Sequence, residues 1–344
     1  MNSLRYLLCL LGLLSLTTAC EPKVGVADQA NDDEAWYHLY MAVSAGLKAA
    51  IFQDEDVYDA IIGAHGYEHK IVRNAVKYAT NYGPLISVSK VLYRYPHYNK
   101  EAVEVDLLAL VEAGLFRVLP SGSYRTTPEG QQIVNTYWEW SASKAKASDK
   151  VPEPDLVLLE EVLAQLVLAA SILDDGFPNA SIKNRIKSRP AQFSELPMAI
   201  KVQTYLREYT AFINDNAHYR YANYFSTQNV SDLDLSPLAY ELLSASRSRT
   251  PSYKLLKCIG QPNWRVGEVG CSRAVMELEE EGLVQLLGGE LRQTDKGKAL
   301  YQSASEFSDH RLYKTWSGLT LEQYAAFRQV LYRLEEHLPP LFGD

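Results

Sequence analysis

Two segments of the chain, residues 107–130 and 275–297, have nearly the same sequence pattern and establish its architecture. Residues 107–130 read LLALVEAGLFRVLPSGSYRTTPEG, and residues 275–297 read VMELEEEGLVQLLGGELRQTDKG. In each copy an apolar run with helical spacing stops at a glycine, and two short segments then flank a turn. A threonine, which commonly caps a new helix, follows each hairpin. Each copy therefore predicts a helix, a two-stranded hairpin and a second helix.

The spacing of the two copies indicates that the chain consists of two similar halves. Gly114 and Gly282, which end the first helix of each copy, lie 168 residues apart (282 − 114). Pro152 and Pro154 stand between the copies in a polar segment, which is typical of a linker. The expected units are an N-terminal half (34–148), a linker (149–155) and a C-terminal half (156–344).

The first residues of the chain have the features of an export signal. Arg5 supplies a positive charge, and residues 6–16 form an apolar run that is too short to span a bilayer. The small residue Ala19 then precedes Cys20. This segment resembles a bacterial lipoprotein signal, in which the cysteine is lipidated and becomes the new N-terminus. Thr17 differs from the leucine that this family usually has three residues before the cysteine.

The lipoprotein resemblance implies an address as well as a modification. It implies a signal peptide over 1–19, a lipid on Cys20, and a polar tether over 20–33 that links the lipid to the fold. The protein would then be held at the outer or inner membrane of the cell envelope, facing the periplasm. Plain secretion and an uncleaved N-terminal anchor are the alternatives.

The duplicated pattern also resembles a known fold. A helix that ends in Gly-Leu, a hairpin, and Tyr-Arg-Thr-Thr-Pro-Glu-Gly over 124–130 resemble a winged-helix domain of the MarR type, and 285–297 repeat the pattern. The resemblance implies that the helix before Gly114 is a recognition helix and that the hairpin is a wing. The expected fold class is therefore mainly α with small β-hairpins, arranged as tandem winged-helix-like halves.

A second and fainter resemblance involves other parts of the chain. Its residues are Tyr82-Gly-Pro-Leu85, the block 194–200, and Leu206-Arg-Glu-Tyr followed by Asn216-Ala-His218. These segments resemble an actinobacterial helical and winged-helix family whose activity is not established. That family has an acidic residue where Asn216 stands here, so any role of that residue is not carried over.

Charge argues against nucleic acid as a partner. Residues 99–112 contain one lysine and four acidic residues, and 265–281 contain two arginines and five glutamates, so each expected recognition helix has a net charge of −3. The whole chain has a formal charge of −8. Helices that read DNA present cations to phosphate groups. Nucleic acid is therefore disfavoured, and a DNA-binding function would require an uncleaved, cytosolic chain.

A short motif points to metal chemistry. His65, Glu68 and His69 match the H-x-x-E-H zinc motif of inverted metallopeptidases. On a continuous helix the two histidines would lie one turn apart on the same face, and Glu68 would be placed as a general base. The strand pair and distal glutamate that accompany the motif in those enzymes are not visible here. The alternative is two ordinary surface or half-buried histidines.

A long helical pattern over 196–225 gathers polar residues that could line a pocket between the halves. The candidates are Arg207, Glu208, Asp215 and His218. Glu208 and Asp215 lie seven positions apart, which places them on the same helix face. The alternative for His218 is a buried, hydrogen-bonded histidine with a structural role.

Two cysteines remain for the folded part, because Cys9 would leave with the signal and Cys20 would carry the lipid. Cys258 and Cys271 flank a loop, and in an oxidising compartment they would form a disulfide. Two reduced, buried thiols are the alternative.

Together these patterns favour a lipid-anchored cell-envelope protein that binds another protein or a small ligand, without catalysis and without a cofactor. Its expected partners are the membrane, through the N-terminal lipid, and a protein of the envelope. A MarR-like winged-helix transcriptional regulator is the alternative. A metal-dependent hydrolase at the H-x-x-E-H motif is the weaker alternative, and no catalytic residue is assigned.

Overall fold

The computed structural model describes residues 57–94, 98–147, 151–227, 233, 235–246, 268–287 and 290–337. It confirms the expected fold class, because it is 75% helix and 6% strand and its strands form small antiparallel pairs. The expected signal peptide, Cys20, the tether and Cys258 lie outside the described residues. None of the described helices is both long and apolar enough to cross a membrane.

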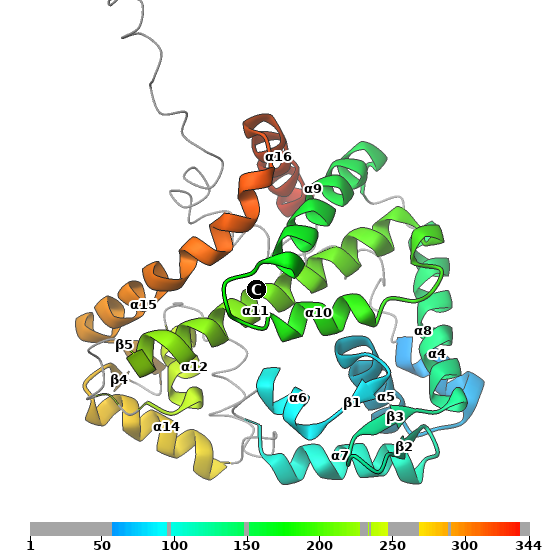
Figure 1. The fold of residues 1–344 in the computed structure, drawn as a ribbon, viewed down its shortest axis with the longest axis horizontal. Coiled ribbons are helices and arrows are strands. Elements are labelled where there is room, and N and C mark those ends of the chain that lie inside the picture. Colours follow the sequence, from blue (N-terminus) through cyan, green and yellow to red (C-terminus); the bar gives the residue numbers. More distant parts are fainter. Residues whose placement is uncertain are drawn as a thin grey trace, which may run out of the picture.

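The first hairpin unit packs helices around a three-stranded sheet (Figure 1). Its elements are α4 (Val57–His65), α5 (His69–Tyr82), β1 (Leu85–Ile86), α6 (Val88–Arg94), α7 (Lys100–Glu112), β2 (Phe116–Val118), β3 (Tyr124–Thr126) and α8 (Pro128–Ala147). The strand order is β1-β3-β2, with both pairings antiparallel. The sequence pattern does not predict β1. It forms because Gly83, at φ 76°, turns the chain after α5 towards the hairpin.

The same junction starts each hairpin. Gly114 and Gly282 have φ values of 75° and 65°, in the left-handed region that glycine adopts without strain. The leucines that follow, Leu115 and Leu283, are fully buried, and their N–H groups donate back to the preceding helix at 2.9 and 2.8 Å. The Gly-Leu pair therefore reverses the chain and fixes the first strand to the core.

A threonine and a glycine join each hairpin to the next helix. Thr127 Oγ1 donates to Gly114 O at 2.8 Å and accepts from the Gly130 N–H at 3.1 Å. Thr294 makes the same two bonds in the second copy, at 2.7 and 3.1 Å. A side chain at Gly130 or Gly297 would meet the backbone carbonyl at the start of the hairpin. This close approach explains why both copies end in Thr-x-x-Gly.

The second hairpin unit has the same order of helix, hairpin and helix (Figure 1), with a two-stranded sheet and a small core of its own. Its described elements are α12 (Pro237–Ala245), α14 (Glu268–Glu280), β4 (Val284–Leu287), β5 (Glu290–Gln293) and α15 (Asp295–Lys314). The strands pair antiparallel, with Leu286 opposite Leu291. The buried residues of this core are Leu235, Ala239, Leu242, Leu243, Ala274, Leu278, Leu283, Val284 and Leu291.

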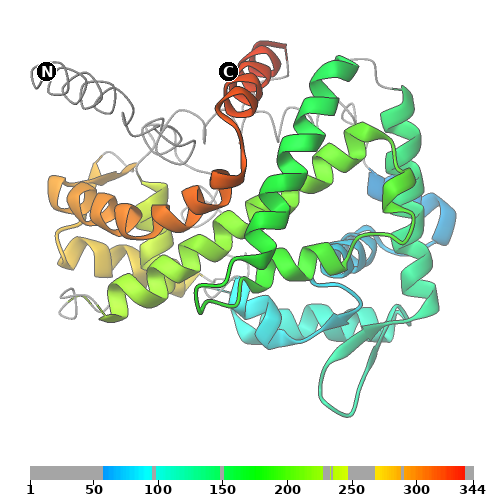
Figure 2. The same ribbon diagram turned by 45° about the horizontal axis from the view of Figure 1, so that its top comes forward.

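Further helices connect the two units. They are α9 (Glu153–Ile172), α10 (Ala180–Lys187), α11 (Met198–Thr227) and α16 (Leu321–His337), with short 3-10 helices η1 (Phe193–Glu195) and η2 (Thr315–Gly318). Helix α11 is 30 residues long and packs against α9 and α10. It runs from α8 of the first unit to α15 of the second, as Figures 1 and 2 show. This helix carries the four residues expected to line a pocket.

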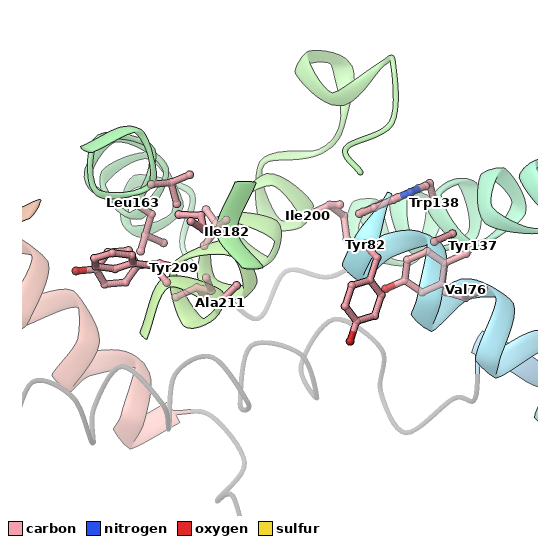
Figure 3. Close-up of a cluster of buried hydrophobic side chains, with 14 of the residues drawn as sticks. Val76, Tyr82, Tyr137, Trp138, Leu163, Ile182, Ile200, Tyr209 and Ala211 are labelled. Atoms are coloured by element: carbon pink, nitrogen blue, oxygen red, sulfur yellow. The ribbon is translucent and has the colours of Figure 1, made fainter. Parts of the chain in front are cut away.

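The main hydrophobic core continues across the expected linker. Tyr82 and Trp138, which precede residues 149–155, belong to one cluster with Leu163 and Tyr209, which follow them (Figure 3). Only the second hairpin unit has a separate cluster among the described residues. The expected domain boundaries stay a prediction, but the described core is divided at the second hairpin unit and not at the linker.

Candidate functional site

The four predicted pocket residues of α11 lie in three different places. Asp215 is buried at the start of α10, and Arg207 and Glu208 line a small cavity beside α5 and α8. His218 lines a larger cavity between the two hairpin units. Glu208 and Asp215 share a helix face, but seven residues separate them by roughly 10 Å along the axis. That separation is enough for each to meet different neighbours.

Asp215 caps a neighbouring helix. Its carboxylate oxygens accept the N–H groups of Ser181 and Ile182, each at 3.0 Å, at the N-terminus of α10. The residue before this helix, Asn179, has φ 45° and its side chain makes no capping hydrogen bond. Asp215, which belongs to another helix, therefore caps α10 in its place. Burial raises the pKa of Asp215, and the backbone hydrogen bonds oppose that rise. Its role is therefore to join α11 to α10.

Glu208 lies in an arginine-rich cavity of about 10 Å³, which is the space of one water molecule. Arg189 Nε and Nη2 donate to its two carboxylate oxygens at 2.6 and 2.5 Å, a bidentate ion pair. Burial raises the pKa of Glu208, and the hydrogen bonds from Arg189 oppose the rise. Arg207 Nη1 donates to Tyr137 OH at 3.1 Å. These contacts join the segment that follows α10 to α11, and α11 to α8.

The cavity beside His218 measures about 280 Å³, and both hairpin units form its walls. The walls come from α6 of the first unit, the segment before α10, α11, and α12 of the second unit. The lining residues are Leu92, Tyr93, Phe177, Ala217, His218, Tyr221, Ala222, Tyr240 and Glu241. The volume is near the lower end of the range for small-molecule sites, roughly 300–1,000 Å³. This cavity is the candidate ligand site.

Aromatic rings dominate its walls, and several of their polar atoms are bound to the protein. The Tyr93 and His218 ring centroids lie 5.3 Å apart, and those of Tyr221 and Tyr240 lie 6.0 Å apart. His218 Nε2 lies 3.1 Å from Arg94 O, a contact that places the proton on Nε2 because a carbonyl only accepts. Burial raises the pKa of Tyr240 to about 12, so this phenol stays neutral at physiological pH. The cavity therefore suits a largely apolar ligand.

Arg311 of α15 packs against Phe177, one of the residues that line this cavity, and the sequence pattern did not identify it. Its side chain is only 1% exposed. It forms a bidentate pair with Asp175, and it donates to Asn179 Oδ1 at 2.7 Å and to Asn216 Oδ1 at 3.3 Å. Its guanidinium also lies 5.1 Å from the ring centroid of Phe177. Its place in the last turn of a helix was the only local signal, since cations are common there.

The continuous helix that the H-x-x-E-H zinc motif requires is not formed. His65 is the last residue of α4, His69 is the first residue of α5, and Gly66 breaks the helix between them with φ 73°. His65 Nε2 lies 3.1 Å from Thr136 Oγ1, and the His69 ring packs against Tyr58 at 5.6 Å. The two histidines therefore do not share a helix face. Within the described ranges, no group of three or more His, Cys, Asp or Glu is placed to hold a metal ion.

Cys271 is disulfide-bonded and buried on α14. Its partner lies outside the described residues, as do Cys9, Cys20 and Cys258. The pairing of Cys271 with Cys258 therefore stays a prediction.

Comparisons with protein-family models, with curated proteins and with solved structures found no match to this chain. Function is therefore inferred from the residues and cavities described above, together with the resemblances in the sequence.

Proposed function

We propose that this chain is a lipid-anchored cell-envelope protein that binds a small, largely apolar ligand beside His218 and catalyses no reaction. The observation that carries the proposal is the cavity of about 280 Å³ between α6, α11 and α12. Because both hairpin units line it, a ligand there would contact both. The anchor rests on the resemblance of residues 1–20 to a lipoprotein signal.

A binding function without chemistry is supported by the state of the α11 carboxylates. Asp215 caps α10, and Glu208 is paired with Arg189. Neither carboxylate lines the cavity beside His218. The two acids that the sequence predicted to line a pocket with His218 are therefore engaged in structural bonds elsewhere.

A transcriptional regulator of the MarR type is the alternative, and the element order favours it. Over 69–126 the chain forms a helix, a strand, two helices and two strands, which is the order of a winged helix. In that function α7 and α14 would enter the major groove. The exposed side chains of Glu101 and Glu112 on α7, and of Glu279 and Glu280 on α14, would then face phosphates. Their charge opposes DNA binding.

The anchor is tested by Cys20→Ser in bacterial cells labelled with palmitate. The wild-type chain should incorporate the label and fractionate with membranes, and the variant should do neither, because the thiol that accepts the lipid is absent. Cys9→Ser is the matched control and should keep the label. An unlabelled, cytosolic wild-type chain would contradict the anchor and favour the regulator.

The ligand site is tested by filling it. Ala217→Phe places a benzyl group in the cavity, so it should weaken binding of the neutral fluorescent probe N-phenyl-1-naphthylamine by about tenfold or more. Fluorescence titration measures this loss. Ala325→Phe, at an exposed position of α16, is the control and should bind like wild type. Equal binding by Ala217→Phe and Ala325→Phe would show that the probe lies elsewhere.

A further inference from the structure

Exposed apolar side chains recur at equivalent positions of the two hairpin units. Leu108 on α7 and Met276 on α14 lie 168 residues apart, the offset of the repeat, and are 47% and 56% exposed. Val118 on β2 and Leu286 on β4 have the same offset, and both are 50% exposed. A single exposed apolar residue needs no explanation. The same exposure at matching positions of two units indicates a surface with one common use.

An exposed glutamate lies close to Leu108 on α7, and another lies close to Met276 on α14. Glu112 and Glu280 have the same offset, lie one helical turn after Leu108 and Met276, and are exposed. Within the described part of the chain, neither carboxylate forms an ion pair. Helix α14 itself contains one arginine, Arg273, and four glutamates, which gives it a net charge of −3 (1 − 4). Because they are one helical turn apart, Leu108 and Glu112 share one face of α7, and Met276 and Glu280 share one face of α14. We define the first docking surface as Leu108 and Glu112 with Val118 on the strand that follows, and the second as Met276 and Glu280 with Leu286 on the strand that follows.

We propose that each docking surface binds a basic amphipathic helix of a protein partner. An amphipathic helix lays its apolar stripe against an apolar strip and leaves its polar flanks at the rim. Lysine or arginine on those flanks would meet Glu112 on the first surface and Glu280 on the second. The partner is thus selected by charge as well as by apolar contact.

The duplication has a physical benefit for such a partner. Each docking surface has few apolar side chains, so one helix alone would bind weakly. The two surfaces belong to one chain whose units are connected by α11. A partner that presents two basic helices would bind the second one at high effective concentration, which raises the overall affinity without any new contact.

Other occupants are opposed by the same charges. Duplex DNA and anionic membranes carry negative charge and would be repelled by the carboxylates of both surfaces. A second copy of this chain would bring Glu112 or Glu280 against another acidic rim. A basic protein helix is the occupant that satisfies both the apolar centre and the charge.

The test uses the full-length protein and a synthetic amphipathic helical peptide with leucine on one face and lysine on the other. Isothermal titration calorimetry should give two peptides per chain in the wild type. Leu108→Asp and Met276→Asp should each reduce this number to one, and the double variant should bind none. The matched control is Leu168→Asp with Ile172→Asp, which alters exposed apolar residues on α9 and should leave two sites.

Two further probes decide what the surfaces recognise. A peptide of the same composition with a scrambled order should bind at least tenfold more weakly, because it has the charge but no apolar face. A duplex DNA oligonucleotide should not bind. The proposal is overturned if the control variant loses binding like the docking variants, if the scrambled peptide binds equally, or if DNA binds and Leu108→Asp abolishes it. Wild-type binding of N-phenyl-1-naphthylamine is independent of all these outcomes, so the ligand site is judged separately.

Discussion

Gly297→Ala is expected to destabilise the second hairpin unit by about 3 kcal/mol. A Cβ at this position would lie 2.0 Å from Leu283 O, far closer than side chains tolerate. Leu283 O also accepts the Thr294 N–H at 3.0 Å, so moving it aside breaks the bond that joins the hairpin to α15. Gly130→Ala should act in the same way on the first unit, because its Cβ would lie 2.2 Å from Leu115 O.

Hydrogen exchange measured by mass spectrometry checks this prediction element by element. In Gly297→Ala the amides of α12, α14 and β4 should exchange on the order of a hundredfold faster, because these elements share a separate core. Amides of α9 should keep their wild-type rates.

Gly63→Ala is the matched control for both glycine variants. Gly63 lies in α4 with no neighbouring atom within 4 Å of an added Cβ, so alanine should stabilise the protein by about 0.4–1 kcal/mol. If Gly297→Ala proved as stable as Gly63→Ala, contact with the carbonyl would not be the reason for glycine at that position.

Both hairpins could be predicted from the sequence because the interactions that form them are local. Gly114, Thr127 and Gly130 contact one another across a single hairpin, and each contributes a property of its residue type. Glycine accepts the left-handed turn, and the threonine hydroxyl caps the next helix. The repeat 168 residues later uses the same residue types. The mainly α fold class and both hairpins followed from these features.

The contacts of α11 could not be predicted in this way. Asp215 bonds to backbone groups 33 and 34 positions away, and Arg311 meets Asp175 across 136 positions. The polar character of these residues is visible in the sequence, but their partners depend on how α9, α10 and α15 pack. His218 was expected between the halves. The aromatic residues around it, such as Tyr93 and Tyr240, were not, because nothing local relates them.

The helix that the H-x-x-E-H motif requires is interrupted for a reason that is present in the sequence. Gly66 lies between the two histidines and adopts φ 73°, which no continuous helix contains. The motif requires two ligands on one helix face. A break between His65 and His69 removes that geometry whatever the residue types, so a literal match had little weight without its helical context.

Arg311→Met is expected to lower the free energy of unfolding by about 3 kcal/mol, because the Arg311 side chain is only 1% exposed and its loss removes hydrogen bonds from three neighbouring side chains. Methionine keeps part of the aliphatic volume, but Asp175, Asn179 and Asn216 lose hydrogen bonds. Burial alone would raise the pKa of Asp175, and the hydrogen bonds and charge of Arg311 hold it below its ordinary value. This contribution is present at neutral pH and is lost as the pH falls through that depressed pKa. The difference in stability between wild type and variant should therefore become smaller in acid, while the part due to Asn179 and Asn216 remains.

Urea unfolding measures the effect, and Arg333→Met is its control. Arg333 pairs with Asp155 at 2.5 Å, but its side chain is 50% exposed, so its loss should change the unfolding free energy by about 1 kcal/mol or less. Equal losses of unfolding free energy in the two variants would show that burial does not make the Arg311 pair more stabilising than the exposed Arg333 pair.

Arg311 also lies over Phe177, which lines the cavity beside His218. Arg311→Met should therefore weaken binding of N-phenyl-1-naphthylamine, and Arg333→Met should not, because Arg311 packs on Phe177 whereas Arg333 is not among the residues that line the cavity.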